Sequence, residues 1–120
     1  MTANSPDFDL LISKRDCLDK CLQKGMKRAG STDNQEEQNL LYTKCTKLKD
    51  KLNIINSILF SQNTASFNDL VSRLNQLSET TKEKLAALEA TVDNLKTAVQ
   101  IAEALDAGLE IAAGLAGQAM

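Results

Sequence analysis

Apolar residues recur at helical spacing near the start of this chain. They follow a period of three to four residues, and the series is Phe8, Leu11, Ile12, Leu18, Leu22 and Met26. Ser5 can cap a helix, Pro6 suits the first helical position, and Gly30 is a natural terminator. The pattern predicts a first helix over about residues 6–29.

A seam of apolar residues predicts a second helix over about residues 33–61. Its members alternate at four and three residues, the spacing of left-handed helix packing, and are Leu41, Cys45, Leu48, Leu52, Ile55 and Leu59. Ser31, Thr32 and Asp33 offer caps for its first turn. The short Gly30-Ser31 connection predicts that this helix runs antiparallel to the first.

A third pattern covers about residues 66–117 and shifts its phase by one residue near Thr80. Ser66 can cap its start, and Thr80 with Glu83 has the spacing of a capping box. One continuous helix would be about 80 Å long, against about 43 Å for the second helix. In a monomer, half of its apolar seam would lie uncovered. The pattern therefore predicts either a break near Thr80 or at least a dimer through residues 85–116.

The segment from Ala98 to Met120 is the most apolar part of the chain and contains no basic residue. On a helix, its acids share one narrow arc, and the remaining apolar arc is wider than a surface helix needs. Small residues recur there at four-residue spacing, as Ala104, Gly108, Ala112 and Ala116. We expect this helix to be buried centrally in a bundle or shared with a partner. Glu103, Asp106 and Glu110 make it unsuitable as a bilayer span, because acids cost more on insertion than its Leu and Ile residues gain.

These patterns together predict the all-α class. The expected architecture is an antiparallel up-and-down bundle of three or four long helices, with residues 1–120 forming a single domain. Four aromatic residues, one proline and an apolar fraction of 42% agree with helix-on-helix packing. The polar N-terminus has no signal-peptide pattern, so we expect a cytoplasmic protein, with a position peripheral to a membrane left open.

The net charge is −2, but its distribution is uneven. Basic residues prevail in the first thirty residues, and acids outnumber bases from residue 65 onwards. This asymmetry suits solvated faces of amphipathic helices, packing of the first segment against the last, or head-to-tail association. Nucleic-acid binding is not expected, because no basic stripe is joined to exposed aromatics.

The chemical inventory is thin. Without histidine, the commonest general base and zinc ligand are missing, so we expect no enzyme, cofactor, metal or small-molecule substrate. A hairpin turning near residues 30–31 would bring Cys17 level with Cys45, which makes a thiol pair a candidate. A metal site formed by these two, Cys21 and a carboxylate is an alternative. Burial of all three as small core residues is the simpler interpretation.

Two functions use the C-terminal helix. In the first, the chain is a non-enzymatic interaction module that packs against another protein's helix or a second copy of itself through Leu95, Val99, Ala102, Leu105, Gly108, Leu109 and Ala112. In the alternative, the bundle is membrane-active, and its architecture resembles pore-forming helical toxins and cell-death effectors. Small residues at four-residue spacing suit helix association in lipid. The acids that follow Lys96 disfavour binding to anionic lipid.

Overall fold

The computed structural model describes residues 6–61 and 63–117, and within them it contains helices and no strand. The elements are α1 (Pro6–Ser31), α2 (Gln35–Phe60), α3 (Thr64–Asn75), α4 (Glu79–Thr91), the 3-10 turn η1 (Val92–Asn94) and α5 (Ala98–Ala116). The expected all-α class is confirmed. The described helices outnumber the three or four expected.

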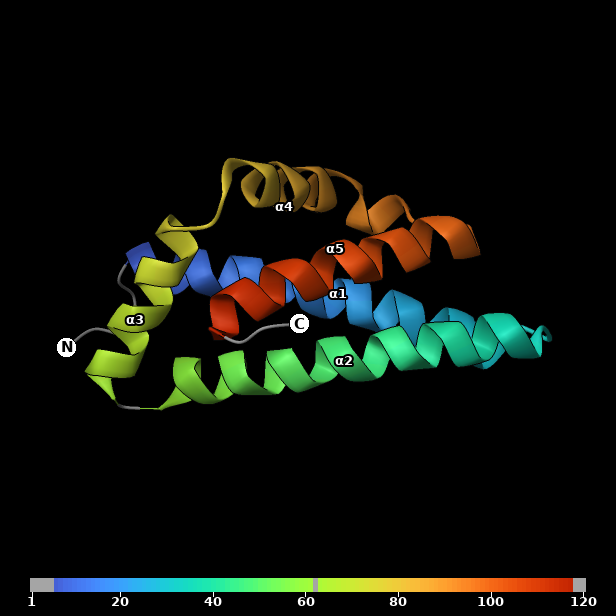
Figure 1. Cartoon of the computed structure of the whole chain (residues 1–120), viewed down its shortest axis with the longest axis horizontal. Helices are drawn as coiled ribbons and strands as arrows, with labels where there is room; N and C mark the ends of the chain where they lie inside the picture. The colour runs from blue at the N-terminus through green and yellow to red at the C-terminus, as the bar shows by residue number, and fades with distance from the viewer. Residues whose placement is uncertain (1–5, 62, 118–120) are drawn as a thin grey trace.

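The long helices α1 and α2 form an antiparallel hairpin, and α5 lies along it in the direction of α2 (Figure 1). The shorter α3 crosses one end of the hairpin, and α4 lies over α5 on the side away from α2. Helix α5 packs against each of the other four α-helices. It is therefore the central element of the bundle.

The core consists of the predicted seams and the apolar arc of α5. All six residues of the α2 seam are buried, which confirms the heptad pattern. In α5 the buried set is Ile101, Ala104, Leu105, Gly108, Ile111, Ala112, Ala113, Leu115 and Ala116. The central burial expected for this helix is confirmed.

Of the two alternatives for residues 66–117, the continuous helix is wrong and the break near Thr80 is confirmed, but the chain breaks a second time within this segment. The first break precedes α4, where the Ser78 side chain accepts the Thr81 N–H at 3.1 Å. It lies close to the break expected at Thr80, but Ser78 is the cap in place of Thr80. The second break covers η1 and the residues before α5, and the sequence pattern missed it. The dimer through residues 85–116 depended on a continuous helix, and this condition is not met.

Three helix ends also differ from those expected. Helix α1 continues through Gly30 to Ser31. A side chain at position 30 would have open space around it, since a Cβ built there meets no atom within 4 Å. Helix α2 begins after Asn34, whose side chain accepts the Glu37 N–H at 2.9 Å. Helix α3 begins after Asn63, which accepts two backbone N–H groups. In α2 the cap lies immediately after the predicted candidates Ser31, Thr32 and Asp33, and in α3 it lies three residues before the predicted Ser66, which is itself helical. In both cases an asparagine takes the capping role, because its side-chain oxygen reaches the first free N–H groups.

The uneven distribution of charge leads to ion pairs between the first helix and the segment around α4 and η1. Lys14 of α1 pairs with Glu89 of α4 at 2.9 Å, and Lys20 pairs with Asp93 of η1 at 3.4 Å. The basic first helix thus lies beside the acidic segment that precedes α5. Exposed ion pairs contribute at most about 1 kcal/mol each, so they orient α4 more than they stabilise it.

Helix α5 starts with a capping box. The Thr97 hydroxyl accepts the Gln100 N–H at 3.1 Å, and the Gln100 side chain accepts the Thr97 N–H at 3.2 Å. Thr97→Ala is expected to lower the free energy of unfolding by about 1 kcal/mol, because it leaves an N–H of the first turn without its partner. Urea denaturation measures this change. Thr97→Ser keeps the hydroxyl and should lose less than half as much; equal losses would contradict the capping role.

Candidate functional site

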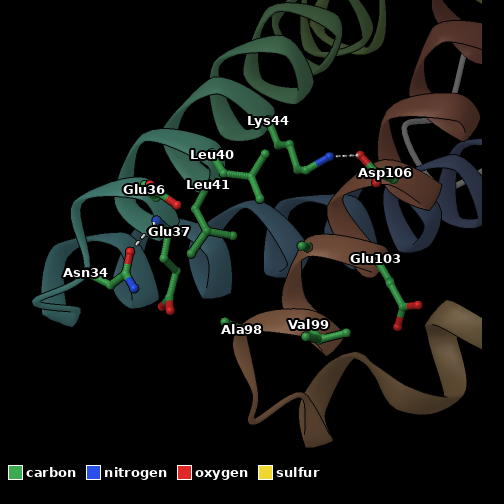
Figure 2. Close-up of a pocket in the computed structure, with 11 residues that line it drawn as sticks. Asn34, Glu36, Glu37, Leu40, Leu41, Lys44, Ala98, Val99, Glu103 and Asp106 are labelled. Atoms are coloured by element: carbon green, nitrogen blue, oxygen red, sulfur yellow. Dashed lines mark hydrogen bonds and ion pairs between the residues drawn. The ribbon is translucent and has the colours of Figure 1, made fainter.

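A groove lies between the N-terminal parts of α2 and α5. It has a volume of about 500 Å³. We call it the tip groove, and its lining residues are Asn34, Glu36, Glu37, Leu40, Leu41 and Lys44 from α2 with Ala98, Val99, Ala102, Glu103 and Asp106 from α5. Figure 2 shows Leu40 and Leu41 extending from α2 towards α5 and Lys44 reaching across to Asp106.

The groove follows from a difference in helix length. Helix α1 has 26 residues and α5 has 19, or about 39 Å and 28 Å at 1.5 Å per residue. The tip of the α1–α2 hairpin therefore extends beyond the start of α5 (Figure 1). Helix α4 ends at η1, and α5 begins only at Ala98. No continuous helix therefore covers the N-terminal part of α2.

The groove exposes apolar side chains next to the core. Leu41 is buried beneath it, whereas Leu40 is 51% exposed and Val99 is 67% exposed. These two come from helices that lie far apart in the sequence, yet they line the same hollow. Full burial of a Val or Leu side chain is worth about 1.5–3 kcal/mol, so covering both would favour association.

Carboxylates surround this apolar surface. Asp106 pairs with Lys44 at 2.6 Å, and Glu37 pairs with Arg28 of α1 at 2.7 Å. The hydrogen bond from Arg28 holds the pKa of the Glu37 carboxyl below its usual value. Each helix N-terminus adds about half a positive charge that acts within the first turn. It offsets only part of the charge of Glu36 at the start of α2 and acts little on Glu103, which lies beyond the first turn of α5.

The structure distributes the predicted interaction residues over three environments. Leu105, Gly108 and Ala112 are buried against the other helices and are not accessible in this conformation. Leu95, Ala102 and Leu109 are half-buried, and Val99 is exposed. Of the predicted set, Val99 and Ala102 line the tip groove.

The α2 side of the groove was not singled out from the sequence. Leu40 lies one residue before the buried seam and does not share its spacing, so the apolar pattern did not include it. The spacing of Thr97 and Gln100 is that of a capping box, and this pattern in the sequence indicates a helix start at Thr97. A new helix start at Thr97 breaks the register of the earlier seam, which places Val99 off the buried face.

The candidate thiol pair of Cys17 and Cys45 does not form. All three cysteines are free and buried. The connection between α1 and α2 covers residues 32–34, later than expected, so Cys45 lies beside Leu22, whose carbonyl accepts its thiol at 3.9 Å. Burial raises the pKa of the Cys45 thiol. Its environment is that of a small core residue.

Cys17 instead meets Cys21, one helical turn away. Their side-chain hydrogen bond lowers the pKa of the Cys17 thiol and, together with burial, raises the pKa of Cys21. Residues four apart on a helix have Cβ atoms about 5–6 Å apart, whereas a disulfide needs about 3.5–4.5 Å. Oxidation of this pair would therefore distort α1.

A second hollow of about 430 Å³ lies between α1 and the α4–η1 region, and Cys17 forms part of its wall. Carboxylates of Asp9, Asp16, Glu89 and Asp93 line it together with Lys20. In the described part of the chain, no three Cys, Asp or Glu side chains converge closely enough to hold a metal ion. Of these two hollows, the tip groove is the one lined by the large exposed apolar side chains Leu40 and Val99 together with charged residues.

No protein-family model, curated protein or solved structure matches this chain. Its function is therefore inferred from its own residues. Over residues 6–61 and 63–117, none of the helices combines the length and the apolar character needed to cross a bilayer.

Proposed function

We propose that this chain is a non-enzymatic helical-bundle interaction module that binds another protein through the tip groove. The observation that carries the proposal is the exposure of Leu40 and Val99 in one hollow directly above the core. Both are large apolar side chains on rigid helices, so their positions are set before binding and little conformational entropy is lost there.

The shape of the groove supports a helix as the bound element. Its lining extends over about 15 Å of α2, from Asn34 to Lys44, and about 12 Å of α5, from Ala98 to Asp106. Two to three turns of a helix match this length. Amphipathic helices bind such grooves through apolar residues three and four positions apart.

Binding should depend on the two exposed apolar residues. A display library of natural protein fragments, selected on the wild-type chain, is expected to yield ligands that bind the double variant Leu40→Gln/Val99→Gln at least about tenfold more weakly. Glutamine preserves helix propensity and adds no charge, so the fold should remain intact. Surface plasmon resonance measures the affinities, and circular dichroism checks the helical content.

The matched control is Met26→Gln/Tyr42→Gln. Met26 and Tyr42 are 46% and 43% exposed and lie outside the groove. Ligands should bind this control like the wild type. Equal binding to both double variants, or selection of no ligand, would contradict the proposal.

A further inference from the structure

We infer that the partner of the tip groove is a cationic amphipathic helix of another protein, with an apolar stripe that covers Leu40 and Val99 and basic residues on its flanks. This inference rests on the proposed function and adds the chemical class of the partner. It follows from the charges around the groove and from the surfaces that this chain itself can offer.

The first argument is the sign of the charge around the groove. Four of the five charged side chains in its lining are carboxylates, and the fifth, Lys44, is paired with Asp106. Arg28 neutralises Glu37 from α1. Glu36 and Glu103 are both exposed, and they come from opposite walls of the groove. A helix lying between the walls with lysine or arginine on both flanks would meet one carboxylate on each side.

The second argument concerns where these charges lie. Leu40 and Glu36 are four residues apart on α2, and Val99 and Glu103 are four residues apart on α5. Each exposed apolar residue therefore has a carboxylate one turn away on the same helix face. The same spacing on a partner, with basic residues beside an apolar stripe, is complementary to both walls at once. An acidic helix would bring like charges together, which opposes binding.

A second copy of the chain is a poorer match. The apolar faces of its basic helices α1 and α2 are buried inside the bundle. The large apolar residues that they expose in the described part of the chain are Leu10 and Met26 on α1 and Leu40, Tyr42 and Phe60 on α2. Neither set forms a stripe at three- and four-residue spacing. These helices present lysines without the apolar surface that would cover Leu40 and Val99.

Three synthetic peptides of about 18 residues, or five helical turns, test the inference. The first has leucines three and four positions apart with lysines on both flanks. The second replaces its lysines by glutamates, and the third scrambles the first so that composition and charge stay while the stripe is lost. Fluorescence anisotropy with the full chain measures binding over a range of salt concentrations, with the helicity of the first two peptides matched by trifluoroethanol titration.

We expect the first peptide to bind at least about tenfold more tightly than either of the others. The variant Glu36→Gln/Glu103→Gln should weaken its binding by about tenfold and reduce the dependence on salt, because two charge pairs are lost. The control Asp50→Asn/Glu83→Gln removes two exposed carboxylates outside the groove and should bind as the wild type does. Leu40→Gln/Val99→Gln should also weaken binding.

Each other outcome has a definite meaning. Equal binding of the basic and acidic peptides through Leu40 and Val99 would overturn the inference and leave the proposed function standing. Equal binding of the scrambled peptide, or indifference to Glu36→Gln/Glu103→Gln, would also overturn it. If no peptide binds but the chain self-associates through Val99 in sedimentation, the groove joins two copies. If neither occurs, this inference is overturned, and the selection from the fragment library decides separately whether the proposed function stands.

Discussion

Leu105→Ala is expected to lower the free energy of unfolding by about 3 kcal/mol. Leu105 is fully buried in the middle of α5, the helix that packs against every other α-helix. Truncation removes apolar contacts and leaves a cavity that close-packed neighbours cannot fill completely. Domains are stable by only about 5–15 kcal/mol, so this loss would be a large share of the total. Urea denaturation followed by circular dichroism measures it.

The comparison variant is Leu40→Ala, which removes the same atoms from a side chain that is 51% exposed. It should cost less than about 1 kcal/mol, since little apolar surface leaves the core. Leu105 was also a predicted partner contact. A stability loss at Leu105 no larger than that at Leu40 would contradict its place in the core.

Gly25→Ala is expected to lower the free energy of unfolding by about 1–2 kcal/mol, although alanine favours helices. A Cβ at position 25 would lie 2.7 Å from the Cys45 sulfur and 2.8 Å from a methyl carbon of Leu105. Overpacking of a filled core costs about 1–3 kcal/mol, which exceeds the gain of about 0.5–1 kcal/mol from replacing a helical glycine. Differential scanning calorimetry would record the decrease as a lower melting temperature.

Gly108→Ala is the matched control and should have the opposite sign. Gly108 is also buried in a helix, but its added Cβ would lie 3.5 Å from Leu48 and 3.6 Å from Leu18, which is ordinary contact. The propensity gain of about 0.5–1 kcal/mol should therefore prevail. Cys45→Ala removes one of the two close atoms and should partly restore the stability of Gly25→Ala. Equal effects at the two glycines would show that the close approach at Gly25 is not real.

These two glycines show which close helix contacts can be predicted from residue spacing and which cannot. In the last helix, small residues at four-residue spacing, Ala104, Gly108, Ala112 and Ala116, were expected to allow close approach of another helix. In the structure the tightest approach at a described glycine is at Gly25. Gly25 lies in another series of small, buried residues at four-residue spacing, Cys17, Cys21, Gly25 and Ala29, which the sequence analysis did not single out. Spacing along one helix shows which residues share a face. It does not show which side chains of the other helices meet that face.

In the candidate site, too, the spacing along one helix predicted part of the surface, and the positions of other helices decided the rest. Val99 was expected to join an interaction face because it continues the spacing of Leu88, Val92 and Leu95. It is exposed because the helix ends at η1 and restarts after Thr97. Leu40 gave no signal of its own, since its exposure depends on where α5 begins. Glu36 is explained locally as a first-turn acid near the positive end of α2.

The sequence by itself determined the all-α class, the two long hairpin helices, the buried seam of α2 and the central burial of the last helix. These features depend on the period of the apolar residues, which is a local property of the chain. Only the tertiary structure decided the hairpin register that separates Cys17 from Cys45, the close contact at Gly25 and the groove formed by Leu40 and Val99. Each of these depends on the relative lengths and positions of helices far apart in the sequence, and helical periodicity contains no information about either.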